Sequence, residues 1–233
     1  MKFLAAFVSG IAVGVAAFFA LLYFNPLTSS ERLSPLSVSD NQVISFNYSA
    51  LASDALVYTN DGESQVAPYP EKVLQLWEPT VRRTDAMAMV LRDSRNVPAA
   101  IGIKFSSDSE STRVLNGEAI VDSVWHVYAP GQGSLFIEQQ ENYWNYLRDI
   151  VIPARWSSGN NWRGNWNGVI TSGPGALGTS RVIGGSGIFA GLESDGVESL
   201  KAKAYSVELG PVAMDAELAI EIPRRDASLS QDP

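Results

Sequence analysis

The apolar run at the start of the chain constrains its fold and location more than any other feature. From Phe3 to Phe24 the sequence reads FLAAFVSGIAVGVAAFFALLYF, and Ser9 is the clearly polar side chain within it. A helix rises about 1.5 Å per residue, so this run is long enough to cross the roughly 30 Å hydrocarbon core of a bilayer. The sequence therefore predicts one transmembrane helix, residues 1–24.

A cleaved secretory signal is the alternative interpretation of this run. Signal peptides carry an apolar stretch of about 7–15 residues that ends at a small-x-small cleavage site. Here the run is longer, LLYFNP at 21–26 offers no Ala-x-Ala, and Tyr23 and Phe24 are typical of a membrane interface. These features favour an uncleaved signal-anchor. Lys2 precedes the span, which favours a cytoplasmic N-terminus and a domain on the extracytoplasmic side.

Composition excludes several kinds of site. The chain has no cysteine, so disulfides, a lipoprotein anchor and thiolate metal sites are excluded. With Lys2 assigned to the anchor, 16 of the 17 basic residues remain against 25 acidic ones, a net charge of −9. Such an acidic domain is a poor partner for nucleic acid or an anionic lipid surface. With a single histidine, a tetrahedral zinc site is not expected, and we predict neither a metal nor a cofactor.

The rest of the chain divides into three parts. Residues 25–40 are rich in Pro and Ser and read as a tether, and residues 223–233 as a disordered polar tail. Residues 41–222 are one domain's worth of sequence and can bury a full core.

The clearest pattern in this domain is that of β-strands. From Val212 to Ile222 apolar residues alternate with Asp215, Glu217 and Glu221, which predicts a strand with one wet face. Gly210-Pro211 separates it from a run at 197–209, and Asp195-Gly196 reads as a hairpin turn after 187–194. These three strands would form a meander.

Similar signals recur upstream. They predict strands at 54–59 (before the turn Asp61-Gly62), 86–91, 99–106 and 118–128, the last introduced by Asn116-Gly117. Residues 137–151 have helical spacing but equally fit a strand followed by a loop. Many short strands at close spacing predict an all-β fold, an antiparallel sandwich or barrel.

A glycine-rich segment at 182–191, VIGGSGIFAG, needs separate consideration. Gly185-x-Gly187-x-x-Ala190 formally matches a dinucleotide fingerprint, but Gly191 and Asp195-Gly196 interrupt the helix that would hold the pyrophosphate. Instead, the segment and the hairpin after it, over roughly 170–222, resemble the late strands of the allene oxide cyclase-like (calycin-like) barrels, which include the dirigent proteins. The resemblance implies an eight-stranded antiparallel barrel around an apolar cavity, and it implies no catalytic residue.

His126 is the weak candidate for acid–base chemistry. Glu118, Asp122 and His126 share one face of the strand expected at 118–128, so Asp122 could tune the pKa of the imidazole inside a cavity. The alternative, which we favour, is that this face of the strand meets solvent.

Tryptophan and asparagine gather between Trp156 and Gly168. Trp156, Trp162, Arg163 and Trp166 lie in what reads as a Gly-rich loop, where Trp faces and Asn amides could bind a glycan or shape the mouth of a barrel. Packing of the Trp rings on the barrel is the alternative.

Two functional hypotheses follow. In the first, a membrane-tethered barrel binds a small apolar molecule and guides its cyclisation or isomerisation without a cofactor, as the resemblance suggests. In the second, a non-enzymatic envelope protein binds a glycan or a protein partner. The sequence leaves open whether the protein is an enzyme and whether it forms a homo-oligomer.

Overall fold

The computed structural model describes residues 2–24, 42–59 and 84–223. The tether, the tail after Pro223 and the turn at Asp61-Gly62 therefore lie outside the described residues. The elements, in chain order, are α1 (Lys2–Phe24), β1 (Gln42–Ser49), η3 (Ala52–Asp54), β2 (Leu56–Thr59), β3 (Thr84–Arg92), β4 (Pro98–Asp108), η5 (Val114–Asn116), β5 (Ile120–Ala129), β6 (Gly133–Asn142), α2 (Trp144–Tyr146), η6 (Leu147–Val151), α3 (Ile152–Trp156), β7 (Asn161–Val169), β8 (Thr171–Gly173), β9 (Ser180–Gly185), η7 (Gly187–Phe189), β10 (Ser194–Ser206) and β11 (Gly210–Ile222).

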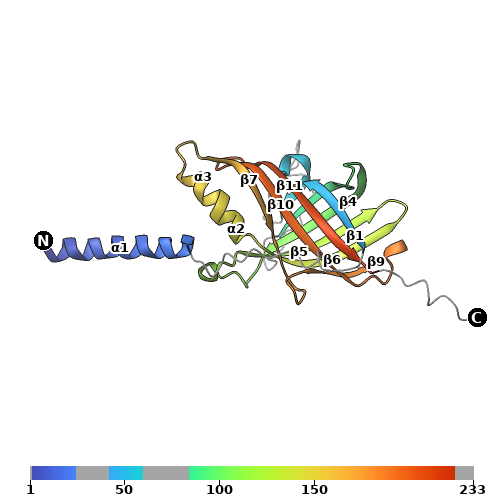
Figure 1. Ribbon diagram of the computed structural model, residues 1–233, viewed down its shortest axis with the longest axis horizontal. Helices are drawn as coiled ribbons and strands as arrows, with labels where there is room; N and C mark the ends of the chain where they lie inside the picture. The colour runs from blue at the N-terminus through green and yellow to red at the C-terminus, as the bar shows by residue number, and fades with distance from the viewer. Residues whose placement is uncertain (1, 25–41, 60–83, 224–233) are drawn as a thin grey trace, which may run out of the picture.

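The domain is an antiparallel β-barrel of eight strand positions, as predicted (Figure 1). The ring runs β1-β11-β10-β9-β6-β5-β4-β3 and returns to β1 through the pair Asn47 and Arg92. Two positions of the ring are shared between strands. At the position next to β3, β1 pairs with one end of β3 and β2 pairs with its other end. Between β6 and β10, β9 fills one end while β8 and β7 fill the other.

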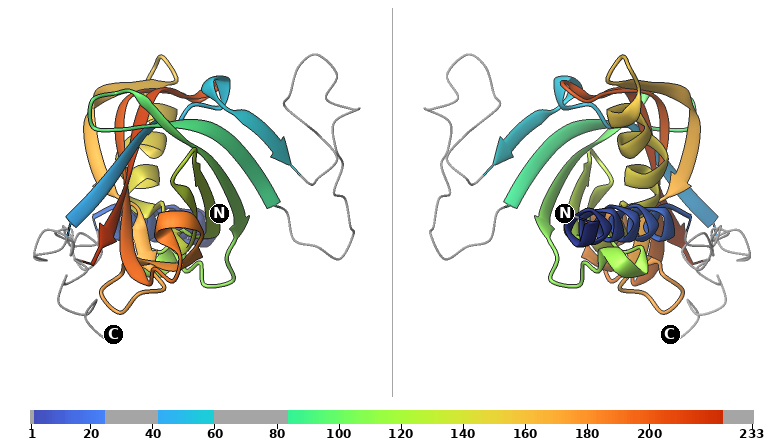
Figure 2. Two further views of the ribbon diagram at one scale, coloured as in Figure 1. Left: turned by 90° about the vertical axis from the view of Figure 1, so that its right-hand side faces the viewer. Right: turned by 90° about the vertical axis from the view of Figure 1, so that its left-hand side faces the viewer.

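The seam between β1 and β3 is open at one end of the barrel. β3 pairs with β1 only at Arg92, whereas Asp85 to Ala88 pair with β2. Figure 2 shows β2 and β3 curving away from β1 together. β3 thus exchanges one partner for the other along its length, and β1 and β3 are not paired at this end of the barrel.

Alternation along the strands builds the core. On β11, Ala216, Leu218 and Ile220 are buried while Asp215 is exposed, which confirms the predicted alternation. Val212, expected on the buried face, is 46% exposed at the start of the strand. The other large side chains that fill the centre of the barrel are Phe46, Leu91, Trp125, Val127, Leu135, Ile137, Val182 and Phe189.

The glycine-rich segment forms a sharp bend, as predicted. β9 ends there and the chain turns through η7, with Gly187 at a φ of +63°. A Cβ on Gly187 would lie 2.1 Å from the carbonyl oxygen of Gln132, and one on Gly133 would lie 2.0 Å from that of Ser186. The bend therefore packs backbone to backbone on the β5–β6 turn, which only glycine allows at these positions.

Three sequence predictions in this half of the chain are wrong. The strand expected at 187–194 is absent, because η7 occupies Gly187–Phe189 and β10 begins only at Ser194. Asp195-Gly196 is not a turn, because both residues lie within β10 and pair with Arg181 and Ser180 of β9. The stretch expected to be a loop at 156–168 ends in strand β7, which pairs with β10. Its glycines reflect the tryptophan rings: a Cβ on Gly168 would lie 2.6 Å from Trp166. Glycines are typical of a loop, whereas in the structure each glycine of β7 leaves room for the ring of a nearby tryptophan on the same strand.

Residues 137–151 combine the two alternatives. β6 continues to Asn142, and a helical segment follows in which η6 is a π-helical turn. This segment packs over β7 and β10 through a small second cluster of Tyr146, Ile150 and Ala202. It therefore covers the end of the barrel at which β7 lies.

Helix α1 is long and apolar enough to cross a membrane, a test that an N-terminal signal sequence also passes. The structure thus bears out the predicted helix, and the choice between anchor and cleaved signal remains a prediction.

Candidate functional site

The face of β5 that carries His126 lies on the outside of the barrel. His126 is half-buried and stacks on Phe136 of β6, with ring centroids 4.6 Å apart. Asp122 accepts a hydrogen bond from Gln140 Nε2 at 2.9 Å. Glu118 lies before the strand, and its backbone forms an isolated antiparallel β-bridge with Arg113. None of the three lines the cavity described below, and their acid–base role remains a prediction.

The tryptophan-rich segment is divided between surface and packing. Trp156 is 71% exposed at the end of α3. Trp162 and Trp166 are half-buried on β7 and pack against the small second cluster, and Trp166 Nε1 donates to Asp149 Oδ2 at 3.3 Å. Arg163 is exposed on the same strand. The structure therefore gives the two β7 rings packing contacts, while their proposed role in binding stays untested.

Polar side chains that the sequence analysis missed gather inside the barrel. They point inward from five strands and form what we call the polar layer: Tyr48, Lys104, Ser123, Gln139, Glu141 and Glu198. Lys104 follows Ala100 and Gly102 on the inward side of β4, and Gln139 and Glu141 follow Leu135 and Ile137 on β6. On β4 and β6 a polar residue therefore continues an apolar inward row, whereas on β10 Glu198 is followed inward by Leu200 and Ala202.

Lys104 stands between the two glutamates. Its Nζ lies 2.8 Å from Glu198 Oε1 and 2.9 Å from Glu141 Oε1. Both glutamates are fully buried, and Lys104 is 7% exposed. One ammonium thus faces two carboxylates in a medium where unpaired charge is costly.

Neutral donors complete the coordination of the carboxylates. Glu198 accepts hydrogen bonds from the Tyr48 hydroxyl, from Gln139 Nε2 and, at 3.1 Å, from Trp125 Nε1. Glu141 accepts from the Ser123 hydroxyl, from Gln139 Nε2 at 2.7 Å and from the Tyr143 hydroxyl at 2.6 Å. The Oε1 atom of Gln139 is buried and has no hydrogen-bond partner in the structure.

Lys104, Glu141 and Tyr143 each keep one protonation state near neutral pH. Burial lowers the pKa of Lys104, but the two glutamate charges outweigh it and raise that pKa above its usual value. Burial raises the pKa of Glu141, but Lys104 and the hydroxyl donors outweigh it and lower that pKa. Burial and the Glu141 charge raise the pKa of Tyr143 well above its usual value. These three side chains therefore form a fixed, charged, hydrogen-bonded arrangement and are not poised to exchange protons.

A cavity of about 380 Å³ opens next to the polar layer. We call it the mouth cavity, and its lining consists of Asp85, Met87, Ser106, Ser107, Asp108, Val121 and Tyr143. On β4, Ser106 lies two residues after Lys104, and on β5, Val121 lies two residues before Ser123. Both belong to the inward rows of their strands, so the cavity is one layer above the polar layer. It lies at the end of β3 that pairs with β2 rather than with β1.

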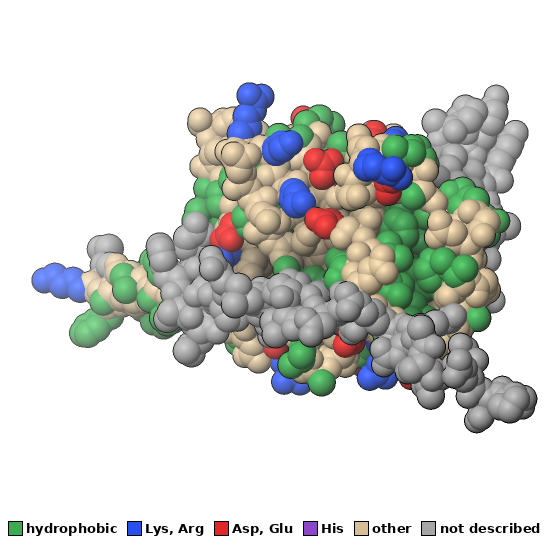
Figure 3. Space-filling model, turned by 45° about the vertical axis from the view of Figure 1, so that its right-hand side comes forward, with side chains coloured by type: hydrophobic (Ala, Val, Ile, Leu, Met, Phe, Trp, Pro, Cys, Tyr) green, Lys and Arg blue, Asp and Glu red, His purple; other side chains and the backbone are tan. Residues whose placement is uncertain are grey.

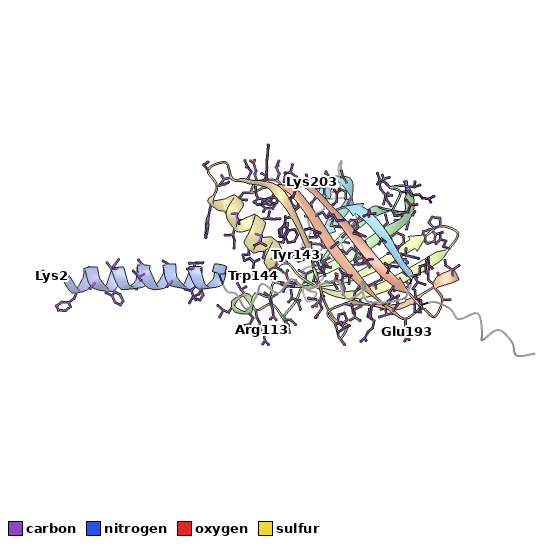
Figure 4. All side chains as sticks on the ribbon, viewed as in Figure 1. Lys2, Arg113, Tyr143, Trp144, Glu193 and Lys203 are labelled. Carbon is purple, nitrogen blue, oxygen red and sulfur yellow. The ribbon has the colours of Figure 1, made fainter. Side chains whose placement is uncertain are left out.

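Tyr143 connects the cavity to the buried charges. It follows β6 directly and precedes α2, as Figure 4 shows, so its backbone is fixed by both elements. Its ring lines the mouth cavity while its hydroxyl donates to Glu141. Since this proton is committed to Glu141, the phenol oxygen can still accept a hydrogen bond from a molecule in the cavity.

The described ranges contain no group of three or more His, Asp or Glu side chains arranged to hold a metal ion. The place between Glu141 and Glu198 that a cation could take is occupied by the Lys104 ammonium.

Comparison with known proteins gives the chain no family. No model of a protein family matches it, and no curated protein matches it. One solved structure that matches is a nonspecific heme-binding cyclase that catalyses [4 + 2] cycloaddition during neoabyssomicin biosynthesis. The two share 9% sequence identity with a TM-score of 0.37, over 92% of this chain and 83% of that one. A likeness of this size assigns neither family nor substrate, so the chain stands as an antiparallel β-barrel preceded by an apolar helix.

Proposed function

We propose that this protein is a membrane-tethered barrel that binds a small, largely apolar molecule in the mouth cavity and guides its cyclisation or isomerisation. The observation that carries the proposal is the position of Tyr143, which faces the cavity and is held from behind by the buried Glu141. A structural polar layer alone would not need an open cavity above it.

The size and lining of the cavity suit such a ligand. Small-molecule sites usually occupy about 300–1,000 Å³ and combine apolar contacts with a few fixed polar groups. Met87 and Val121 supply apolar contact, while Ser106, the Tyr143 oxygen and the carboxylates of Asp85 and Asp108 supply polar groups at the lining. These groups can orient one polar end of a ligand whose remainder packs on the apolar lining.

The chemistry that this site favours is confinement. Because Tyr143 and Lys104 keep their protons and Glu141 stays ionised near neutral pH, they are poorly matched to general acid–base catalysis. A rigid cavity can still accelerate a cyclisation by holding a flexible chain in a reactive conformation. This mode of action uses no cofactor.

The tether is part of the proposal. Helix α1 would remain uncleaved and hold the barrel on the extracytoplasmic side, where the acidic domain is not drawn to anionic lipid headgroups. An apolar ligand that partitions into the bilayer would then be concentrated near the barrel.

Native mass spectrometry of the full-length protein released from detergent micelles tests the binding. We expect a co-purified small molecule on the wild type and its loss in Val121→Trp, which fills the cavity. The matched control is Val124→Trp, three residues along β5 on the outer face, where the side chain is 40% exposed. Wild-type protein without a bound small molecule, or a small molecule that still binds Val121→Trp, would overturn the proposal. Either result would favour the second hypothesis, a non-enzymatic protein that binds a glycan or a protein partner.

A further inference from the structure

We propose that the outer face of β4, β5, β6 and β9 is the interface through which two copies of this chain associate. This surface, which we call the apolar wall, consists of Ile101, Phe105, Val124, Tyr128, Phe136 and Ile183. The inference concerns the outside of the barrel and does not depend on the proposed function.

The apolar wall breaks the usual pattern of an antiparallel barrel. Outward residues of such a sheet are normally polar where they meet water. These six side chains are instead large and apolar, with exposed fractions between 40% and 53%. On the opposite side, β10 and β11 point Lys201, Lys203 and Asp215 outward. On the face that Figure 3 presents, most charged side chains lie in the upper part and many hydrophobic ones lie toward the right, with some charged side chains directly beside them.

Strand register makes the apolar wall continuous. Ile101 lies opposite Tyr128, and Phe105 lies opposite Val124, on β4 and β5. His126 separates Val124 from Tyr128 on β5 and stacks on Phe136 of β6, so the two rows are joined in the middle. A hollow of about 220 Å³ opens beside Phe105 and Val124 and could receive a side chain from a partner.

The area of the wall matches what a stable dimer needs. Taking a full large side chain as roughly 150–250 Å², these exposed fractions leave roughly 550 Å² of apolar surface. A standard interface buries about 800 Å² on each partner, and homodimer interfaces are about 65% apolar. The wall therefore supplies about the apolar area of one such face, with a polar rim still to be added around it.

The charge around the wall favours a second copy over a membrane. Glu138 is exposed next to Val124 and opposite the exposed Arg181 of β9, with Asp122 close by on β5. These neighbours are two acidic residues and one basic residue, and the domain as a whole carries a net charge of −9. An anionic lipid surface attracts basic side chains and repels such a rim. Two copies joined elsewhere would bring their net charges together, whereas joining at the apolar wall places few charges in contact.

The absence of cysteine from the chain gives a direct test. Single-cysteine variants Val124→Cys and Tyr128→Cys flank His126 on the wall, and Lys203→Cys is the matched control on β10. In membranes from expressing cells, oxidation with copper phenanthroline should cross-link a wall variant into dimers and leave Lys203→Cys monomeric. Ala6, Gly10 and Gly14 recur four residues apart on α1, a spacing that allows close helix approach. The cross-link should persist in a Gly10→Ile background, because the anchor helix is not the source of the contact.

A second measurement addresses affinity without cross-linking. Full-length protein in amphipol should be dimeric by mass photometry, and the pair Val124→Lys and Phe136→Glu should weaken association, raising the dissociation constant at least about tenfold. Both side chains point outward, so we expect the variant to fold. An unchanged circular-dichroism spectrum would show that it does. A wild type that stays monomeric, or wall variants that dimerise like the wild type, would overturn the proposal. So would an environment-sensitive dye on Val124→Cys that is quenched by spin-labelled lipid, since the wall would then face the bilayer.

Discussion

Replacing Lys104 with methionine should show how far charge holds the polar layer together. Methionine fills much of the same volume but leaves Glu141 and Glu198 buried without a cation. Removing one partner of a buried ion pair costs about 3–5 kcal/mol, a large part of a typical stability of 5–15 kcal/mol. For a domain of this size each kcal/mol lowers Tm by about 2–4 °C, so we expect a fall of about 6–20 °C.

The loss should depend on pH, with a sign that can be worked out for Glu141. In the wild type its pKa is lowered, so its contribution to stability is present at neutral pH and is lost as pH falls through that lowered pKa. Without the Lys104 charge, only the hydroxyl donors oppose the burial, which is the largest influence on Glu141, and the pKa in the folded state should rise above the unfolded value of about 4.3. The folded variant then binds the proton more tightly than the unfolded chain. Its stability should fall as pH rises above about 4.3, by up to about 1.4 kcal/mol per pH unit.

Near-ultraviolet circular dichroism of the full-length protein in dodecyl maltoside, heated at several pH values between about 5 and 8, measures both effects. The control is Lys201→Met, because Lys201 pairs with Glu217 at 3.1 Å on the surface with its side chain 48% exposed. That change should cost less than about 1 kcal/mol and show no slope with pH in this range. If Lys104→Met melts within about 2 °C of the wild type at neutral pH, or shows no pH slope, the argument from buried charge is refuted.

Three further predictions address the core, the bend and the anchor. Ile220→Asp should unfold the barrel by circular dichroism, because Ile220 is fully buried and an unpaired carboxylate there costs several kcal/mol, while Asp215→Asn on the exposed face should be nearly silent. Gly187→Ala should lower Tm more than Gly191→Ala, since both glycines have positive φ but only at Gly187 would a Cβ meet backbone; equal effects would show that packing of the bend is unimportant. The mature protein should resist carbonate extraction and keep residues 1–24, and N-terminal sequencing that begins near Thr28 to Glu31 would contradict this.

The fold could be predicted because alternation and turn chemistry act locally. The strand at Val212 to Ile222 and the turn at Asn116-Gly117 carry their own signals, and the structure places β11 and the start of β5 there. The turn predicted at Asp195-Gly196 is absent because Gly196 instead allows β9 to pack closely on β10. A Cβ on Gly196 would lie only 2.6 Å from Ser180 Oγ. A dipeptide alone does not distinguish a turn from a close approach between strands.

The polar layer could not be predicted, because the alternation rule assigns polar residues to the wet face. Lys104, Glu141 and Glu198 come from β4, β6 and β10, far apart in the sequence, and each is tolerable inside only because the other two are present. A usable signal did exist: Lys104 continues the inward row of Ala100 and Gly102 in step. Reading it required knowing which rows meet at the same end of the barrel, which depends on strand order and register.

The pairing of β1 with β11 has a consequence for the order in which the domain can assemble. Eight residue pairs, from Gln42 with Ile222 to Ser49 with Asp215, join the first strand of the barrel to the last. During synthesis β1 leaves the ribosome first and cannot find this partner until almost the whole domain has followed. Contacts so distant in sequence form slowly, and a strand with unpaired edges is a template for aggregation. The nascent barrel therefore spends its synthesis as an open sheet with an unprotected first strand, and a companion that shields Gln42–Ser49 during that interval would raise the yield of folded protein.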